Sequence, residues 1–235
     1  MSTHFAIYER RPREMLFWVA AERHGNPTAA ISRAADCVTI VSTDRTDTDE
    51  LLHFLQMTGT YTQVQADYSL CSALAVSLGG KLSGGPSMRY LPSASAADIS
   101  PSHISSPPPD ALYAFLCAVF PPSSLGEWPS WYTYHSHLFR HELGFAAGIF
   151  KNGKLIATGG VYATNPRCNL IANIATAPAF RRRGYGSQLV EYLCAVSCRQ
   201  GKIPVLHCAD QSLVRFYAPL GFAPARHWGV LQQYT

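Results

Sequence analysis

The apolar positions of the first part of the chain follow two periodicities, which predict both strands and helices. Short apolar runs at 16–21, 28–32 and 38–42 are separated by turn residues such as Gly25-Asn26-Pro27, a pattern typical of strands. Apolar residues at helical spacing predict helices over 48–55 and 68–78, and Gly79-Gly80 ends the second of them. The first part is therefore predicted to be α+β.

The second part continues this mixture in a longer series. Helical spacing predicts helices over 111–119 and 131–143, and two alternating segments around Asn152-Gly153 predict a hairpin. The remaining segments are a strand at 168–176, a helix at 184–200, a strand at 203–208, a short helix at 211–218 and a strand at 227–234. The predicted order is α-α-β-β-β-α-β-α-β.

The stretch 92–109 is rich in Ser, Ala and Pro and has few large apolar groups, so it is predicted to be a linker. It divides the chain into an N-terminal α+β domain, 1–91, and a second domain, 110–235. The sequence shows no internal repeat, but two α+β halves leave open that the first domain is a distant copy of the second.

Composition excludes several classes of protein. With 47% hydrophobic and 14% charged residues in 235, the chain is neither disordered nor a coiled coil. The longest apolar run, 111–120, is shorter than the ~18 residues of a spanning helix and stops at Pro121. We expect no membrane segment, no signal peptide and a cytoplasmic protein. Seven scattered cysteines without a C-x-x-C pair predict reduced thiols.

The positive charge belongs to the second part. Residues 1–100 hold 8 basic and 10 acidic residues, a net charge of −2, whereas 101–235 hold 11 and 5, a net charge of +6. This modest excess suits a small molecule that carries phosphate. It is too weak to indicate a nucleic-acid partner, for which a strongly basic face is expected.

The segment 169–193 carries the clearest chemical signal. The predicted strand stops before Pro178, and a turn with Gly184 and Gly186 leads into a helix whose first amides lack backbone partners. Glycines allow close approach of the backbone, and the helix dipole favours negative charge. Together with the three arginines at 181–183, this pattern predicts a pyrophosphate site.

These residues resemble a known family. The pattern Pro178-x-Phe180-Arg181-x-x-Gly184-x-Gly186 is similar to the acetyl-CoA signature R/Q-x-x-G-x-G/A of the Gcn5-related N-acetyltransferases (GNAT). About thirty residues later, the segment 216–222 (FYAPLGF) is similar to the second signature of that family, F-Y-x-x-x-G-F. The resemblance covers about 110–235 and implies the mixed-sheet acyl-CoA N-acyltransferase fold for the second domain.

A fainter likeness concerns the segment before the predicted hairpin. His137, Arg140 and His141 look faintly like the glycine N-acyltransferase-like branch of the family.

The resemblance also implies which residues hold acetyl-CoA. Main-chain groups of the strand before the signature bind the pantetheine arm, and amides of the signature loop bind the pyrophosphate. Asp210 stands where many relatives have an Asn that contacts the pantetheine. The positions implied for coenzyme binding are Ile174, Thr176, Arg181, Arg182, Arg183, Gly184, Gly186, Ser187 and Asp210.

The same resemblance assigns Tyr217 as the general acid that protonates the leaving thiolate, a role suited to a phenol with a pKa of ~10. Many relatives have a Glu base on the strand before the signature, where this chain offers Asn169 and Asn173. The base is left open among His141, Glu142, His207, a water chain and an amine that arrives neutral. His137 and His141 have metal-ligand spacing but no carboxylate or cysteine partner, so no metal is expected.

The resemblance therefore predicts an enzyme, an N-acetyltransferase that moves the acetyl group of acetyl-CoA to the amine of a small molecule by direct attack in a ternary complex. A non-catalytic acyl-CoA-binding protein is the alternative, favoured by the missing strand carboxylate. Trp128, Trp131, Tyr132 and Tyr134 are candidates for the acceptor side.

Overall fold

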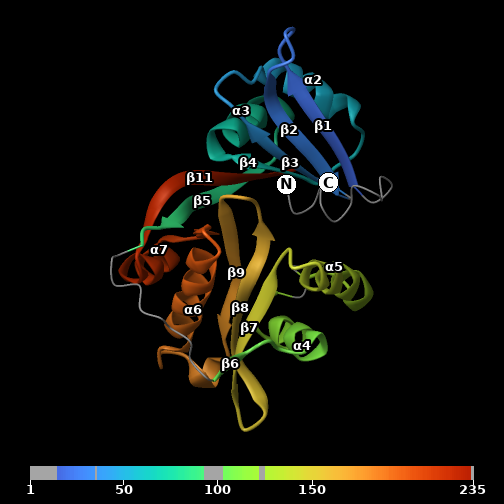
Figure 1. Cartoon of the computed structure of the whole chain (residues 1–235). Helices are drawn as coiled ribbons and strands as arrows, with labels where there is room; N and C mark the ends of the chain where they lie inside the picture. Colours follow the sequence, from blue (N-terminus) through green and yellow to red (C-terminus); the bar gives the residue numbers. More distant parts are fainter. Residues whose placement is uncertain (1–14, 35, 93–102, 122–124, 234–235) are drawn as a thin grey trace.

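The computed structural model describes residues 15–34, 36–92, 103–121 and 125–233. Its strands form one eleven-stranded sheet in the order β1-β2-β3-β4-β11-β5-β10-β9-β8-β7-β6 (Figure 1). The sheet contains both parallel and antiparallel strand pairs and helices pack on it, which confirms the predicted α+β fold class.

The N-terminal half contains a three-stranded meander followed by two helix-strand units. Its elements are β1 (Met15–Ala21), β2 (Pro27–Ala34), β3 (Cys37–Ser42), α2 (Thr48–Met57), β4 (Gln63–Asp67), α3 (Tyr68–Leu78) and β5 (Lys81–Tyr90). The meander and both helices were predicted, whereas β4 and β5 were not.

The C-terminal half has the predicted order α-α-β-β-β-α-β-α-β. Its elements are β6 (Ile104–Ser105), α4 (Pro109–Val119), α5 (Trp128–Arg140), β7 (Phe145–Lys151), β8 (Lys154–Thr164), β9 (Cys168–Thr176), α6 (Tyr185–Arg199), β10 (Ile203–His207), α7 (Gln211–Tyr217) and β11 (Phe222–Gln232). Part of the predicted linker, 93–102, lies outside the described residues. Within its described part, β6 pairs with β7.

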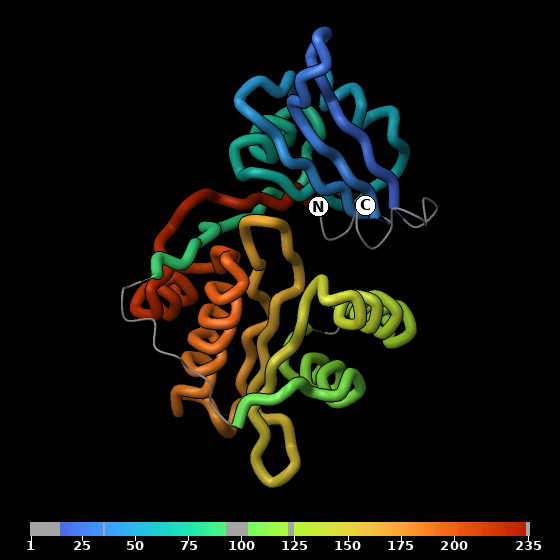
Figure 2. The backbone as a smooth tube through the Cα atoms, viewed as in Figure 1, coloured from blue at the N-terminus to red at the C-terminus, as the bar shows by residue number. Residues whose placement is uncertain are grey.

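The two halves repeat one element order, and each gives its last strand to the other. The series β1-β2-β3-α2-β4-α3-β5 corresponds to β7-β8-β9-α6-β10-α7-β11. However, β5 pairs with β10 of the second half, and β11 lies between β4 and β5. Figure 2 shows these two strands running side by side between the halves. The topology supports the possibility, left open above, that the halves are copies of one fold.

The helices lie on both faces of the sheet. Helix α6 packs on one face of the C-terminal half, and α4 and α5 lie on the other (Figure 1). The main core of this half is under α6 and contains Leu189, Leu193 and Leu206. A second core lies under α2 and α3, around Leu55 and Leu74. These two cores fix β9, β10 and β11, which carry or border the site described next.

Candidate functional site

The parallel strands β9 and β10 separate partway along their length. They pair from Cys168 to Leu170 on β9 and from Ile203 to Val205 on β10, and the described residues beyond these points are not paired with each other. On the other side of β9, the register with β8 shifts at Asn173, whose φ is 55°. This bulge bends β9 away from β10, since an extra residue in one strand increases its local twist. The result is a V-shaped opening between the two strands.

A cavity of about 410 Å³ lies at this opening, between the end of β9, the start of α6 and the inner side of α7. Eight of the predicted site residues line it: Ile174, Thr176, Arg181, Arg182, Gly184, Gly186, Ser187 and Tyr217. These residues come from three elements and a connecting turn, and the fold brings them to one cavity.

The first turn of α6 exposes its backbone amides to this cavity. Gly184 precedes the helix with φ 82°, a left-handed conformation that glycine adopts without steric cost. Within the described part of the chain no side chain caps this helix, and the first helical bond runs from the Gln188 amide to the Gly184 carbonyl. The preceding amides, together with the helix dipole, form a site for an anion.

The helices α2 and α7, unlike α6, begin with a side chain that caps their first amides. The Asp47 carboxylate accepts hydrogen bonds from the Asp49 and Glu50 amides at 2.9 and 3.1 Å, so it caps α2. The Asp210 carboxylate caps α7 through the amides of Ser212 and Leu213, at 2.7 and 3.1 Å. Both of these helix starts already have a carboxylate of the chain at the place where an anion would bind.

Glycine at position 186 keeps the cavity open. A Cβ atom there would lie 3.4 Å from the Phe216 ring and 3.8 Å from the Thr176 hydroxyl. A larger side chain at this position would therefore enter the space between α6 and α7.

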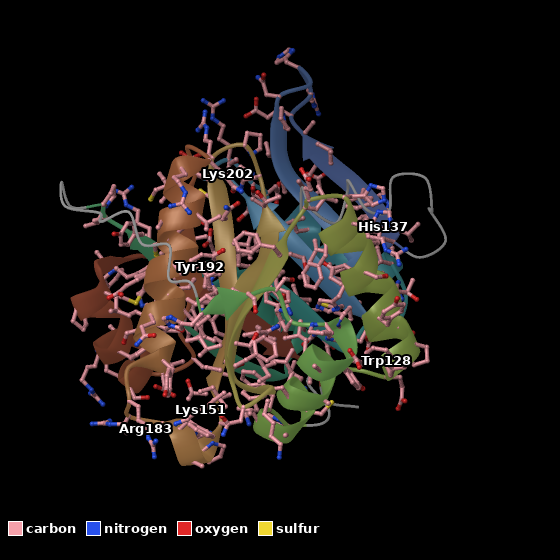
Figure 3. The ribbon with its side chains drawn as sticks, turned by 60° about the horizontal axis from the view of Figure 1, so that its bottom comes forward. Trp128, His137, Lys151, Arg183, Tyr192 and Lys202 are labelled. Carbon is pink, nitrogen blue, oxygen red and sulfur yellow. The ribbon has the colours of Figure 1, made fainter. Side chains whose placement is uncertain are left out.

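Cations surround the mouth of the cavity. The Arg181 Nε donates to the Thr176 carbonyl at 3.2 Å, which fixes the turn after β9. Arg183 does not line the cavity, but its guanidinium lies 5.6 Å from the centre of the Phe180 ring. Lys151 approaches the same ring at 5.7 Å, and Figure 3 shows both cations at one end of the molecule. The sequence analysis did not name Lys151 as a site residue, although it predicted the Asn152-Gly153 turn that follows it.

Tyr217 is almost fully buried and still borders the cavity. Burial raises its pKa well above the ordinary range, and the nearby Cys208 thiol acts in the same direction. Burial also raises the pKa of Cys208 to about 11. Tyr217 therefore keeps its proton at neutral pH, which is the form a general acid requires.

The other predicted site residues lie elsewhere. Asp210 serves as the N-cap of α7 and does not line the cavity. His141 ends α5, with its ring 4.2 Å from that of His137. Glu142 lines a separate cavity of about 350 Å³, together with Asn169 and Lys202. Figure 3 shows Lys202 and Arg183 at opposite ends of the molecule, so this second cavity is remote from the signature turn.

The aromatic residues of α5 mainly build a core. Trp131 is buried between α4 and α5 with Leu112 and Leu116, and Trp128 stacks on it at 5.9 Å. That Trp128, Trp131, Tyr132 and Tyr134 contact the acceptor stays a prediction.

Two further properties concern metals and membranes. Among the described residues, no group of three or more His, Cys, Asp or Glu side chains is arranged to hold a metal ion. None of the described helices combines the length and apolar character of a membrane span.

The segment that contains this site is similar to a known protein family. Residues 110–222 match the family model "Acetyltransferase (GNAT) family". No curated protein is significantly similar to the chain. The match does not distinguish the glycine N-acyltransferase-like branch from the rest of the family.

Solved structures share the fold at low sequence identity. A GCN5-related N-acetyltransferase from Kribbella flavida is 15% identical, covers 100% of this chain and 96% of its own, and has a TM-score of 0.63. A tandem GNAT protein from the clavulanic acid biosynthesis pathway is 15% identical over 100% of this chain and 89% of its own, with a TM-score of 0.60. A GNAT family protein from Novosphingobium aromaticivorans is 21% identical with a TM-score of 0.53, and the alignment spans 66% of each chain.

Proposed function

We propose that the chain transfers the acetyl group of acetyl-CoA to an amine of a small molecule, because residues 110–222 match the model of the GNAT acetyltransferase family, whose members are acyltransferases. The observation that carries this proposal is the uncapped start of α6, which opens into a cavity that Tyr217 also borders. An anion site and a buried acid in one cavity suit a phosphate-bearing thioester.

Acetyl-CoA would supply the activated acetyl group, and the chain would hold and orient it. The amides of Gly186 and Ser187 fit the pyrophosphate, because they lie at the positive end of α6 and border the cavity. Main-chain groups of β9 near Ile174 and Thr176 are free of pairing with β10, so they are available to the pantetheine arm. An amide near Ile174 would polarise the thioester carbonyl.

The reaction proposed is direct attack in a ternary complex. The amine nitrogen bonds to the carbonyl carbon, the C–S bond breaks, and the phenol of Tyr217 protonates the sulfur. Positioning of the two substrates and this proton transfer are the contributions of the chain. No covalent bond between the acetyl group and the protein is needed.

The test is release of free thiol from acetyl-CoA in the presence of a panel of small amines. We expect amine-dependent release that is lost in the Gly186→Leu variant, whose side chain enters the cavity. Glu191→Leu is the matched control, because Glu191 is exposed on the same helix and does not line the cavity. Coenzyme binding without thiol release with any amine would contradict catalysis.

That outcome would favour the second candidate, a non-catalytic acyl-CoA-binding protein. The specific observation in its favour is that β9 carries Asn169 and Asn173 in place of a carboxylate base. Moreover, the Asn169 amide donates to Ser197 and Gln200 at 3.1 and 2.9 Å, so it serves the packing of α6.

A further inference from the structure

The face of the sheet opposite α6 carries a histidine at the V-shaped opening. Leu206 of β10 and Met88 of β5 are register partners, and both lie in the core under α6. Since neighbouring residues of a strand point to opposite faces, His207 and its register partner Ser87 point away from that core. Tyr217 belongs to the core under α6, so His207 and Tyr217 are on different faces of β10.

His207 also lies in the part of β10 that has separated from β9. The last residue of β10 paired with β9 is Val205, two positions before His207. Cys208, the residue after His207, packs in the same core as Tyr217. His207 does not line the cavity of about 410 Å³. It lies beyond the paired part of β10, on the face opposite Tyr217, and this face is the side from which an amine could reach the opening without crossing the coenzyme.

Two neighbours fix the ring of His207. Its Nδ1 lies 2.8 Å from the Ser87 hydroxyl, within hydrogen-bond distance. In the tautomer that carries its proton on Nδ1, Nδ1 donates to this hydroxyl and Nε2 is an acceptor, and the proposal below uses this tautomer. The Trp228 ring packs at 5.7 Å, and the Trp228 Nε1 donates to the Cys208 carbonyl at 3.3 Å, which holds the end of β10. Burial lowers the pKa of His207, although the residue keeps exposed surface. A neutral imidazole with an exposed edge can accept a proton.

The charged groups around His207 come from the two central strands and β4. Ser87 is also the register partner of Arg226 on β11, and Arg89 stands two positions along β5 on the same face. The Arg226 guanidinium is paired with the Asp67 carboxylate of β4 at 3.3 Å. The Asp67 carboxylate offsets the charge of Arg226, and burial is the cause of the lowered pKa of His207.

We propose that His207, positioned by Ser87, is the base that accepts the proton of the acceptor amine, which reaches the thioester from the face of the sheet opposite α6. This proposal rests on the acetyl transfer proposed above. In this proposal the proton transfer from the amine to His207 and the proton transfer from Tyr217 to the sulfur take place on opposite faces of β10.

The proton balance is complete with these two groups. As the C–N bond forms, one N–H proton passes to Nε2 of His207; as the C–S bond breaks, the Tyr217 proton passes to sulfur. The imidazolium then returns a proton to solvent, and the phenolate takes one up. The products are the N-acetylated amine and free coenzyme A.

The other candidate bases are placed less well. His141 and Glu142 follow α5, and Glu142 lines the second cavity, at the opposite end of the molecule from the signature turn. Asn169 and Asn173 on β9 have amide side chains, which cannot take a proton.

The experiment compares kcat/KM for an amine found in the thiol-release screen, at pH 7 and pH 9, in wild type and variants. For His207→Gln we expect a loss of about 10²-fold or more at pH 7 and a smaller loss at pH 9, where more of the amine is already neutral. The dissociation constant for acetyl-CoA should stay unchanged, which also shows that the variant folds. His227→Gln on β11 is the matched control, because its neighbour Trp228 faces His207 and His227 itself points to the other face.

Ser87 provides a second, independent test. Ser87→Ala should lower kcat at pH 7 with little change in KM, and Ser87→Thr, which keeps the hydroxyl, should restore it. If wild type acetylates an amine and His207→Gln keeps its rate, or if only His141→Gln loses activity, this inference is overturned and the proposed function stands. If wild type releases no thiol with any amine, the proposed function falls and the inference with it.

Discussion

At the scale of single residues, the side chain of Tyr217 combines two properties that chemistry on a thioester needs. It is packed in the core under α6, which keeps its pKa high, and it borders the cavity at the start of that helix. A phenol that is buried but accessible from the cavity can donate a proton to a thiolate and remain protonated between turnovers.

The first prediction concerns this phenol. Tyr217→Phe should lower kcat by about 10²-fold, because the leaving sulfur loses its acid, while the dissociation constant for acetyl-CoA changes little. Steady-state rates and calorimetric binding measure the two effects. Tyr192→Phe on α6 is the matched control, since that tyrosine packs against the core and does not line the cavity. Equal turnover in Tyr217→Phe and wild type would contradict the assignment of Tyr217 as the general acid.

The second prediction concerns His135 on α5. Its Nδ1 donates to the Trp131 carbonyl at 2.8 Å, and its ring stacks on Trp131 at 4.1 Å. Burial lowers its pKa to about 4, and this hydrogen bond only partly opposes the shift. Because the folded pKa is below the unfolded value of ~6.5, the unfolded chain binds more protons between these two values, and stability falls as the pH is lowered from ~6.5 to about 4.

We expect this histidine to cost up to about 3 kcal/mol of unfolding free energy between pH 6.5 and pH 4. Urea denaturation at a series of pH values measures this cost. The slope of the unfolding free energy against pH should be smaller in His135→Phe than in wild type. His24→Gln, in the exposed turn after β1, is the control. A His135→Phe variant with the same pH dependence as wild type would refute the assignment.

Much of the cavity could be predicted at this scale, whereas the sequence left the base open among His141, Glu142, His207, a water chain and a neutral amine. The arginines and glycines within 181–186 lie in one short segment, so local rules for glycines, arginines and a helix start predict them, whereas Ile174, Thr176 and Ser187 were implied by the family resemblance. The contact between His207 and Ser87 joins positions 120 residues apart in the chain. The periodicity of a sequence does not predict a contact between positions so far apart in the chain.

At the scale of elements, the starts of α2 and α6 differ in the charge that they present. Both helices follow the third strand of a meander, but Asp47 caps α2 and Gly184 precedes α6. In addition, Asp49 and Glu50 place negative charge in the first turn of α2. The start of α2 is therefore less suited to an anion than the start of α6.

The third prediction follows from this difference. Asp47→Ala should reduce the unfolding free energy by about 1 kcal/mol through loss of the cap and leave the affinity for acetyl-CoA unchanged. Denaturant titration and calorimetry measure the two quantities. A change in coenzyme affinity in this variant would show that α2 takes part in binding.

The strand β5 shows why part of the sheet was missed. Its sequence contains Gly84, Gly85 and Pro86, a combination typical of turns. In the structure a Cβ at Gly84 would lie 2.3 Å from the Trp228 carbonyl oxygen, and one at Gly85 2.0 Å from that of Cys208. These glycines allow close packing of backbones within the sheet, which is a long-range property.

At the scale of the whole molecule, the exchange of β5 and β11 makes the two halves depend on each other. Ten residue pairs join β11 to β5, and β11 also pairs with β4. The division into 1–91 and 110–235 was predicted from the composition of the linker, which contains no information on strand exchange. The element order of the second half was predictable because its periodicities are local.

The fourth prediction is that the chain unfolds in one transition. Because each half lacks one strand of its sheet without the other, neither half can unfold and leave its partner intact. Scanning calorimetry should give a calorimetric enthalpy equal to the van't Hoff enthalpy. Two resolved transitions would indicate that the halves are independent.

The central claim is that the chain has one site for acetyl-CoA, at the start of α6. Isothermal titration with acetyl-CoA tests it most directly, with Gly186→Leu and Asp47→Ala as the paired variants. We predict one molecule bound per chain, no binding in Gly186→Leu and unchanged binding in Asp47→Ala. Absence of binding at millimolar coenzyme, two molecules per chain, or full affinity in Gly186→Leu would contradict it.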